Sequence, residues 1–376
     1  MTATRCVWPG SWGSSRDRAY PFPLATRYSV KFTPRTIAIT AIKLVLMAVL
    51  LTMVLRQVHW HDTVTATGQL VPGLVTTIRE VNGLYYAMAC LGILGSLVAC
   101  AFRWQRVLAI LGLSFRWSEV LKLVFIGDFF NNFLLGSLGG DAVKVFLALR
   151  QRPNKTIILA SIFADRLIGL IGLSVHAAIM LIILVAQGAI RGRSLWLPVT
   201  PIALVCGGLI GGGVLLFSTR LQRLLRVSAL ASRLPFSDQV RQAGDALRLL
   251  FGRPGPLVPV LAMTLCCQVC SIGAVAFLGG SLNLGIPVSS YLVSVPIIFI
   301  LSAVPVTPGG IGVLEELCLL YFAAAGNPNK VLVLALLIRL TILLCSLPGL
   351  VVFWGYGSKV GEIRSGLEAE ADSGPQ

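Results

Sequence analysis

Long apolar runs recur from one end of this chain to the other, and they limit its fold more than any other feature. Hydrophobic residues make up 56% of the 376 residues and charged residues only 12%, whereas a soluble domain has about 25% charged residues. A run of about 18 apolar residues is long enough to cross the hydrocarbon core of a bilayer as a helix. The alternating polar and apolar pattern of barrel strands is absent. The sequence therefore predicts an all-α, polytopic helical membrane protein.

One apolar segment differs from the others in its flanks. Residues 121–138 follow Arg116 and precede Lys144 and Arg150. Because Lys and Arg gather on the cytosolic side, a short segment with basic flanks at both ends enters and leaves on one face. We therefore expect a re-entrant hairpin here, in addition to about eight transmembrane helices. The crossings are expected at residues 36–55, 81–102, 156–186, 195–217, 257–279, 291–304, 313–325 and 331–354.

Basic residues dominate the segments between the crossings. The chain has 31 Lys and Arg against 15 Asp and Glu, a formal net charge of +16. Cytosolic loops and the anionic lipid headgroups of the inner leaflet account for this bias, and no nucleic-acid-binding motif accompanies it. We expect a protein of the bacterial cytoplasmic (inner) membrane with both termini cytosolic. The expected parts are a disordered basic tail (1–35), a transmembrane domain (36–356) containing an amphipathic basic segment or plain basic loop (219–255), and a cytosolic tail (357–376).

Two glycine-rich breaks interrupt the apolar sequence, one in each half of the chain. The first reads Gly136-Ser-Leu-Gly139-Gly140-Asp141, and the second runs from Pro305 through Pro308-Gly309-Gly310-Ile-Gly312 to Glu315. Broken backbone at membrane depth is tolerated only where protein buries it or where it lines a watery cavity. Paired breaks in two halves are typical of inverted repeats and indicate a substrate site between them. The second break is either a matching hairpin or an interruption within a crossing.

Each break can place a helix N-terminus inside the membrane. We expect the first new helix to start at Asp141, which would be its N-cap, and the second to start near Gly312. Asn131 is expected either to cap the hairpin or to contact a headgroup. A helix N-terminus attracts phosphate or carboxylate, but the same residues could be packing devices with acidic caps.

Charged residues inside the crossings give a second indication of a site. A charge at the bilayer centre costs about 2.5–3.5 kcal/mol. Asp165, Arg166 and Arg339, together with Asp128 or Asp141, are therefore expected to face the bundle interior, either as binding groups or as structural ion pairs. The candidate substrate-binding residues are Asn131, Gly139, Gly140, Asp141, Lys144, Asp165, Arg166, Pro308, Gly309, Gly310, Gly312, Glu315 and Arg339.

The cysteines and the known catalytic motifs give no sign of a metal centre or an enzyme. The nine cysteines lack metal-ligand spacing and no histidine completes a set. Walker, kinase, hydrolase and zincin motifs are absent. We therefore expect no metal, no cofactor and no catalytic residues.

An ordered set of short motifs gives the chain a family resemblance. It comprises Arg103-Trp-Gln-Arg106, Phe129-Phe-Asn131, Gly139-Gly-Asp-Ala-Val-Lys144, Asp165-Arg-Leu-Ile-Gly169 and Pro305-Val-Thr-Pro-Gly-Gly-Ile-Gly-Val-Leu-Glu315. Over about residues 37–356 the chain resembles the flippase-like membrane domain of lysylphosphatidylglycerol synthases. The relatives often have Pro before the first glycine motif, where this chain has Leu134-Leu135. The resemblance implies an integral membrane protein that moves or binds a lipid with a polar headgroup, here without the soluble synthase domain.

Three functions remain open from the sequence. The first is translocation or binding of a phospholipid or polyprenyl-phosphate lipid. The second is a membrane-embedded glycosyl- or aminoacyl-transferase, with Asp128, Asp141 or Glu315 as base or metal ligand. The third is an accessory subunit of a lipid-modifying system. The partners expected besides lipid are a second copy of the chain or a lipid-modifying enzyme.

Overall fold

The structure is a computed structural model, and it describes most of the chain after residue 72. All described residues lie within the compact unit Ile42–Gln376. Residues 1–41 and most of the basic segment 219–255 are not among the described residues. The described residues are 52, 62–64, 70–71, 73–133, 139–152, 154–188, 196–217, 244, 248, 250–252, 254–303, 307, 310–322 and 328–372.

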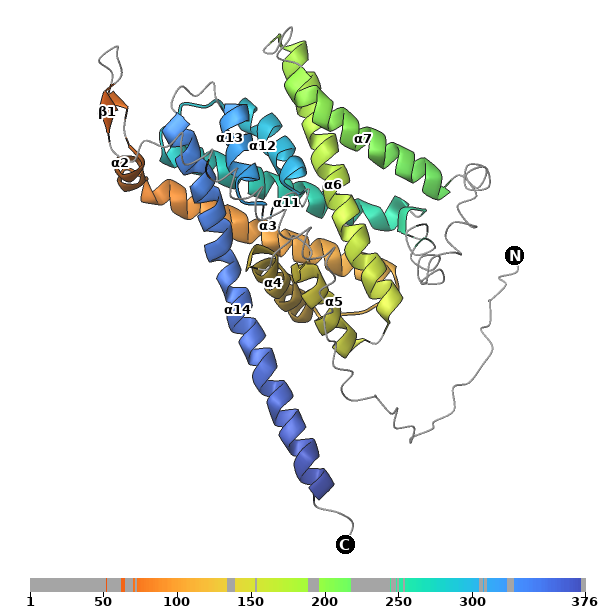
Figure 1. The fold of residues 1–376 in the computed structure, drawn as a ribbon. Coiled ribbons are helices and arrows are strands. Elements are labelled where there is room, and N and C mark those ends of the chain that lie inside the picture. Colours follow the sequence, from red (N-terminus) through yellow and green to blue (C-terminus); the bar gives the residue numbers. More distant parts are fainter. Residues whose placement is uncertain are drawn as a thin grey trace, which may run out of the picture. The chain divides into compact units, whose positions relative to one another are not determined.

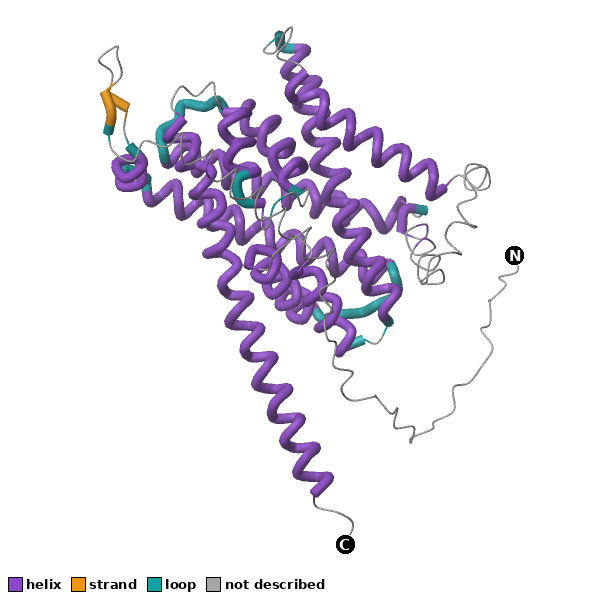
Figure 2. The backbone as a smooth tube through the Cα atoms, in the orientation of Figure 1, coloured by secondary structure: helices purple, strands orange, loops and turns teal. Residues whose placement is uncertain are grey.

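The described part of the chain is almost entirely helical, as Figures 1 and 2 show. A two-stranded antiparallel ribbon, in which Thr63 pairs with Val71, precedes the helices. The elements in chain order are β1 (Thr63–Val64), β2 (Leu70–Val71), α2 (Leu74–Arg79), α3 (Gly83–Ile110), α4 (Trp117–Phe133), α5 (Gly139–Gln151), α6 (Lys155–Ala186), α7 (Trp196–Phe217), α11 (Pro254–Ser281), α12 (Val288–Ser302), α13 (Val313–Phe322) and α14 (Pro328–Asp372).

Among the described residues, four helices are long and apolar enough to cross a membrane. They are Gly83–Ile110, Lys155–Ile183, Gly255–Ser281 and Pro328–Gly355. Shorter apolar helices lie at Val199–Gly208 and Val288–Ser302. The prediction of a polytopic helical membrane protein is confirmed. The first expected crossing, 36–55, lies outside the described residues except for Thr52.

Small residues allow the long helices to approach closely. Lipid tails are as apolar as leucine, so helices in a membrane associate through close packing rather than through the hydrophobic effect. The α3 and α11 helices lie side by side (Figure 1), and Gly92 faces the backbone of Cys270 and the side chain of Ala274 across their contact.

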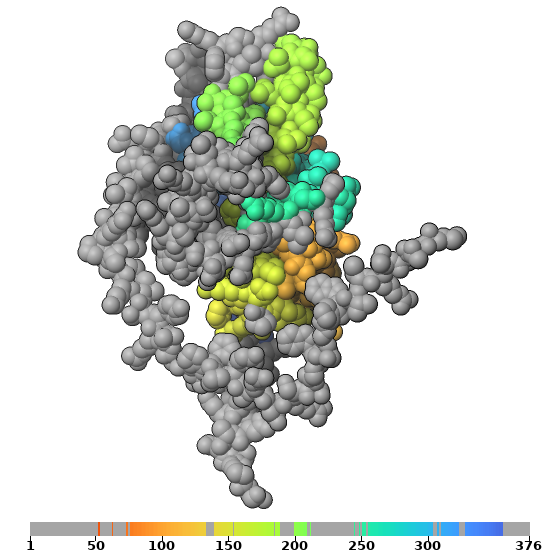
Figure 3. All heavy atoms as spheres, turned by 90° about the vertical axis from the view of Figure 1, so that its right-hand side faces the viewer, coloured from red at the N-terminus to blue at the C-terminus, as the bar shows by residue number. Residues whose placement is uncertain are grey.

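The outer surface of the bundle is apolar. Leu261, Leu265 and Val269 recur every fourth residue along α11 and are all more than half exposed. Figure 3 shows α11 (teal) next to α3 (orange) on one such face. Large contiguous apolar surfaces are rare on soluble monomers, so these stripes are the lipid-facing sides of the helices.

The α4 and α5 helices form the short pair that the sequence predicts around its first break. They have 17 and 13 residues, which correspond to about 25 and 20 Å at about 1.5 Å per residue. Both lengths fall short of the about 30 Å of a hydrocarbon core. The two helices pack on each other, because Gly127 and Gly140 remove the side chains that would separate them.

The last helix extends beyond the predicted crossing. The sequence predicts that this crossing ends at residue 354, but α14 continues to Asp372 through the segment expected to be a cytosolic tail. Its membrane part packs against α4, where Gly349 lies against the backbone of Phe125. This contact joins the C-terminal half of the chain to the first break.

Candidate functional site

The bundle contains an open cavity of about 510 Å³, which is lined by apolar residues and by a cluster of charged side chains. The α3, α4, α5 and α6 helices supply its charged groups, and the end of α12 closes one side with Phe299, Ile300 and Ala303. The polar residues at the cavity are Cys100, Arg103, Asp128, Asn131, Asp141, Lys144, Asp165 and Arg166.

The helix after the first break begins differently from the prediction. The α5 helix starts at Gly139 rather than at Asp141, so the expectation that Asp141 is the N-cap is wrong. Instead, the backbone N–H of Gly140 donates a hydrogen bond of 2.9 Å to Oδ1 of Asn131 on α4. One of the unpaired N–H groups of the helix start is thus satisfied from the neighbouring helix. Asn131 therefore caps the hairpin, which is one of its two predicted roles.

The Asp141 side chain is free of capping and forms ion pairs inside the site. It is only 7% exposed. Its Oδ2 accepts a hydrogen bond of 2.9 Å from Nε of Arg166 on α6. Its Oδ1 lies 3.9 Å from Nζ of Lys144 and has no hydrogen-bond partner within the described part of the chain. Two predicted site residues on different helices are therefore joined, while the other carboxylate oxygen of Asp141 is buried without a hydrogen bond from the described residues.

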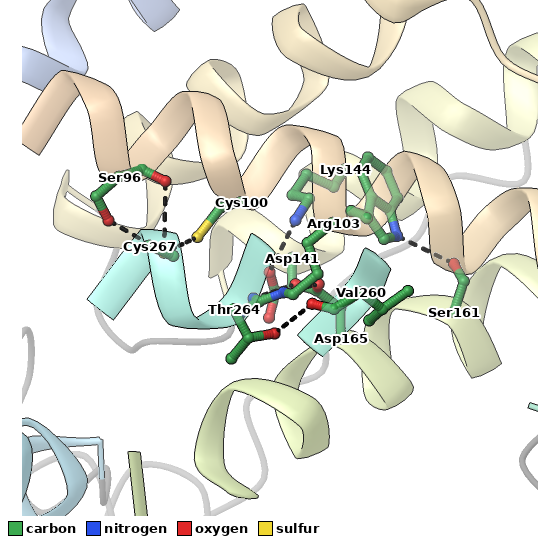
Figure 4. A network of polar contacts seen from close by, with 11 residues as sticks. Ser96, Cys100, Arg103, Asp141, Lys144, Ser161, Asp165, Val260, Thr264 and Cys267 are labelled. Atoms are coloured by element: carbon green, nitrogen blue, oxygen red, sulfur yellow. Dashed lines mark hydrogen bonds and ion pairs between the residues drawn. The ribbon is translucent and has the colours of Figure 1, made fainter. Parts of the chain in front are cut away.

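A second ion pair joins α3 to α6. Nε and Nη2 of Arg103 donate to Oδ1 and Oδ2 of Asp165 at 2.7 and 3.1 Å. This bidentate geometry is the strongest that a guanidinium and a carboxylate can adopt. Arg103 is 7% exposed, so the pair is buried. Figure 4 shows it beside Asp141 and Lys144.

Lys144 is the least bonded of the three cations in the cavity. Its side chain is buried, and its Nζ lies 4.5 Å from the ring centroid of Trp104. A cation over an indole face is attracted by the ring quadrupole. The Trp104 ring is held in place by the hydrogen bond from its Nε1 to Oγ of Ser161, 3.2 Å long. The described residues offer the Lys144 ammonium no hydrogen bond closer than the contact with Asp141.

Arg103 and Asp128 also line the cavity, although neither is among the candidate substrate-binding residues predicted from the sequence. The expected crossing 81–102 ends just before Arg103, whereas α3 continues to Ile110. The apolar residues Val107 and Leu108 after it were the signal for this continuation. The sequence predicts Asp128 either as a base or metal ligand of a transferase or, as an alternative to Asp141, as a residue that faces the bundle interior. In the structure it lies at the cavity, and its Oδ2 is buried without a hydrogen-bond partner among the described residues.

The second break forms a polar cluster of its own. Glu315 on α13 accepts 2.8 Å hydrogen bonds at Oε1 from Nε of Arg339 and at Oε2 from the N–H of Gly312. Arg339 also donates from Nη2 to the carbonyl oxygen of Gly310, at 2.9 Å. Gly310 and Gly312 have φ angles of 65° and 85°, which glycine adopts without a Cβ penalty. The predicted helix start near Gly312 is confirmed by α13, which begins at Val313.

The candidate residues thus fall into two groups. Asn131, Asp141, Lys144, Asp165 and Arg166 meet at one cavity, with Gly139 and Gly140 at the start of α5. In the described part of the chain, Gly310, Gly312, Glu315 and Arg339 do not line that cavity. Pro308 and Gly309 lie outside the described residues.

The apolar spanning helices and the charged residues that they place around one cavity define the class of the protein as a polytopic helical membrane protein. Comparison with known families gives the particular relationship. The family described as the lysylphosphatidylglycerol synthase TM region matches residues 40–349, which is most of the chain, and the protein belongs to that family. No curated protein sequence matches the chain.

Proposed function

We propose that this protein binds a phospholipid or polyprenyl-phosphate lipid and translocates it across the bacterial cytoplasmic membrane. The polar headgroup enters the cavity, and the tails remain in the bilayer. In this proposal the protein is a transporter rather than an enzyme.

The observation that carries the proposal is the density of charge at one internal cavity. Three cations (Arg103, Lys144 and Arg166) and three carboxylates (Asp128, Asp141 and Asp165) line about 510 Å³. Each charge costs about 2.5–3.5 kcal/mol at membrane depth, so a purely structural bundle would not need so many of them in one place. The volume is within the range of about 300–1,000 Å³ that is typical of small-molecule sites. Membership of a family named after a lipid synthase supports a lipid as the ligand.

Translocation is tested with the purified full-length chain in sealed vesicles that contain a trace of phospholipid with a fluorescent acyl chain. A membrane-impermeant reductant quenches the label in the outer leaflet only. With active protein, quenching continues past the outer-leaflet fraction, as labelled lipid moves outward. Rates equal to those of protein-free vesicles, for every phospholipid and polyprenyl-phosphate lipid tried, would contradict the proposal. A new covalent lipid product found by mass spectrometry would favour a transferase instead.

A further inference from the structure

The polar atoms of the cavity separate into those already bonded and those left over. Arg103 and Asp165 satisfy each other through two hydrogen bonds, and Asp141 Oδ2 is bonded to Arg166. Two acceptors, Oδ2 of Asp128 and Oδ1 of Asp141, have no hydrogen-bond partner among the described residues. A buried carboxylate oxygen without a donor is costly. A ligand that donates hydrogen bonds to these two oxygens would remove this cost.

The same cavity offers a cation for an anionic group. The Lys144 ammonium lies 3.9 Å from Asp141 Oδ1, beyond the about 2.7–2.9 Å of a charge-assisted hydrogen bond. It is also longer than the other two ion pairs given above for the described residues at this cavity, which measure 2.7 and 2.9 Å. A phosphate oxygen on Lys144 and a donor on Asp141 would replace one weak contact by two strong ones.

The charge balance of the cavity limits which ligands can carry both a hydrogen-bond donor for the carboxylates and an anionic group for Lys144. With three cations and three carboxylates at the cavity, the ionised side chains sum to zero. A ligand of net charge would leave that charge uncompensated in a medium of low dielectric constant, where it is expensive. A zwitterion adds one positive and one negative group and keeps the balance.

Building on the lipid-binding function proposed above, we propose that the cavity recognises a zwitterionic phosphoamine headgroup with a primary ammonium, of the phosphoethanolamine type. The ammonium donates to Asp128 Oδ2 and Asp141 Oδ1, and the phosphate accepts from Lys144. A primary ammonium has three N–H donors, enough for both carboxylates. A trimethylated ammonium has the same charge and no donor, so the free carboxylate oxygens would stay unsatisfied.

A methylation series tests this directly, because it removes donors and keeps the net charge. Binding of the full-length chain is measured with dioleoyl phosphatidylethanolamine, its N-methyl and N,N-dimethyl derivatives, and the corresponding phosphatidylcholine. We expect affinity to fall along the series, with phosphatidylcholine at least about tenfold weaker, since a hydrogen bond to a charged group is worth about a factor of ten or more. Dioleoyl phosphatidylglycerol, which has a net negative charge, should also bind more weakly.

Asp128→Asn is the decisive variant. Oδ2 of Asp128 makes no hydrogen bond within the described part of the chain, so the substitution should leave folding intact while it removes the negative charge. The preference for the primary amine over the trimethylated one should then fall by about tenfold. The matched control is Glu80→Gln, on an exposed carboxylate at the C-cap of α2, which should keep the preference of the natural protein.

The outcomes separate the two proposals. Equal affinity along the methylation series, or tighter binding of phosphatidylglycerol, overturns the headgroup assignment while lipid binding itself stands. An unchanged preference in Asp128→Asn also overturns it. Failure to bind or move any lipid overturns both proposals.

Discussion

The guanidinium of Arg103 and the carboxylate of Asp165 are 62 positions apart in the sequence, yet they form a bidentate pair with hydrogen bonds of 2.7 and 3.1 Å. The pair connects two helices that are long enough to cross the membrane, α3 and α6. Both side chains are almost fully buried. Removing one partner of a buried ion pair leaves an uncompensated charge, whereas removing both does not.

We therefore expect Arg103→Met or Asp165→Asn alone to lower the free energy of unfolding by about 3–5 kcal/mol. The double variant Arg103→Met/Asp165→Asn should lose less than the sum of the two single losses. Thermal unfolding of the purified full-length chain in detergent measures both. Strictly additive losses would show that the two side chains do not interact.

Close packing at the first break gives a second prediction. A methyl group at residue 140 would collide with the carbonyl oxygen of Gly127 and with Asn131. Gly140→Ala should therefore destabilise the pair of α4 and α5 by about 1–3 kcal/mol, as overpacking does. The control is Gly273→Ala on α11, where a Cβ would meet no atom within 4 Å. It should be neutral or stabilising, because alanine favours a helix by about 1 kcal/mol over glycine. Equal melting temperatures for the two variants would contradict the close approach.

A third prediction concerns whether the charged residues at the second break stabilise the fold. Glu315 accepts hydrogen bonds from Arg339 and from the N–H of Gly312, so Glu315→Ala should cost about 1–3 kcal/mol because both donors lose their carboxylate partner. The next residue, Glu316, is also in the first turn of α13 and forms no ion pair with the described residues. Glu316→Ala should cost less than about 1 kcal/mol. Equal melting temperatures for Glu315→Ala and Glu316→Ala would show that the contacts of Glu315 do not stabilise the fold.

The translocation rate of the folded fraction of Glu315→Gln then separates a structural role of Glu315 from a binding role, since a structural role leaves that rate unchanged.

The contact between α3 and α11 can be tested by cross-linking two cysteines, Cys100 and Cys267. The Sγ atoms of Cys100 and Cys267 lie 2.7 Å apart, and Ser96 Oγ is 3.1 Å from Cys267 (Figure 4). Mild oxidation with diamide should therefore join the two thiols in the full-length protein, and mass spectrometry of peptides would identify the disulfide. Cys100→Ser should abolish this product. A disulfide from Cys267 to a different cysteine would contradict the packing of these helices.

Four of the eight expected crossings correspond to helices that are long and apolar enough to cross a membrane, and the sequence predicts these because each is a continuous apolar run. The expected crossing at 313–325 is instead the 10-residue helix α13. The sequence also predicts the short helices around the first break, since basic flanks and the Gly139-Gly140 pair are local signals. Asp165 could be assigned to the interior by the cost of membrane charge alone, whereas Arg166 lies at the cavity with a side chain that is about half exposed. These inferences need no knowledge of how distant segments pack.

The sequence does not predict which charged residues form ion pairs with each other. Arg103 pairs with Asp165 and Asp141 with Arg166, although Asp165 and Arg166 are adjacent in the sequence. No local sequence signal decides which carboxylate pairs with which guanidinium, because the pairing depends on the rotation of α6 against α3 and α5.

The separation of Glu315 and Arg339 from the first cavity is likewise a tertiary property. Conversely, Asn131 caps α5 from nine positions away, which displaces Asp141 from the role that its sequence position indicates.

Lys144 gives the prediction that bears most directly on the proposed function. Its ammonium is buried over Trp104 and lies 3.9 Å from the nearest carboxylate oxygen in the described structure, so its positive charge contributes little to holding the helices together. Lys144→Met keeps the length of the side chain and its packing against Gly127 but removes the group that would bind a phosphate. We expect translocation to fall by about tenfold or more, with a melting temperature close to that of the natural protein. Lys122→Met, at an exposed position of α4, removes the same charge outside the cavity and should leave the rate unchanged. If Lys122→Met and Lys144→Met slowed translocation equally, the effect would come from the basic surface of the protein and not from the cavity.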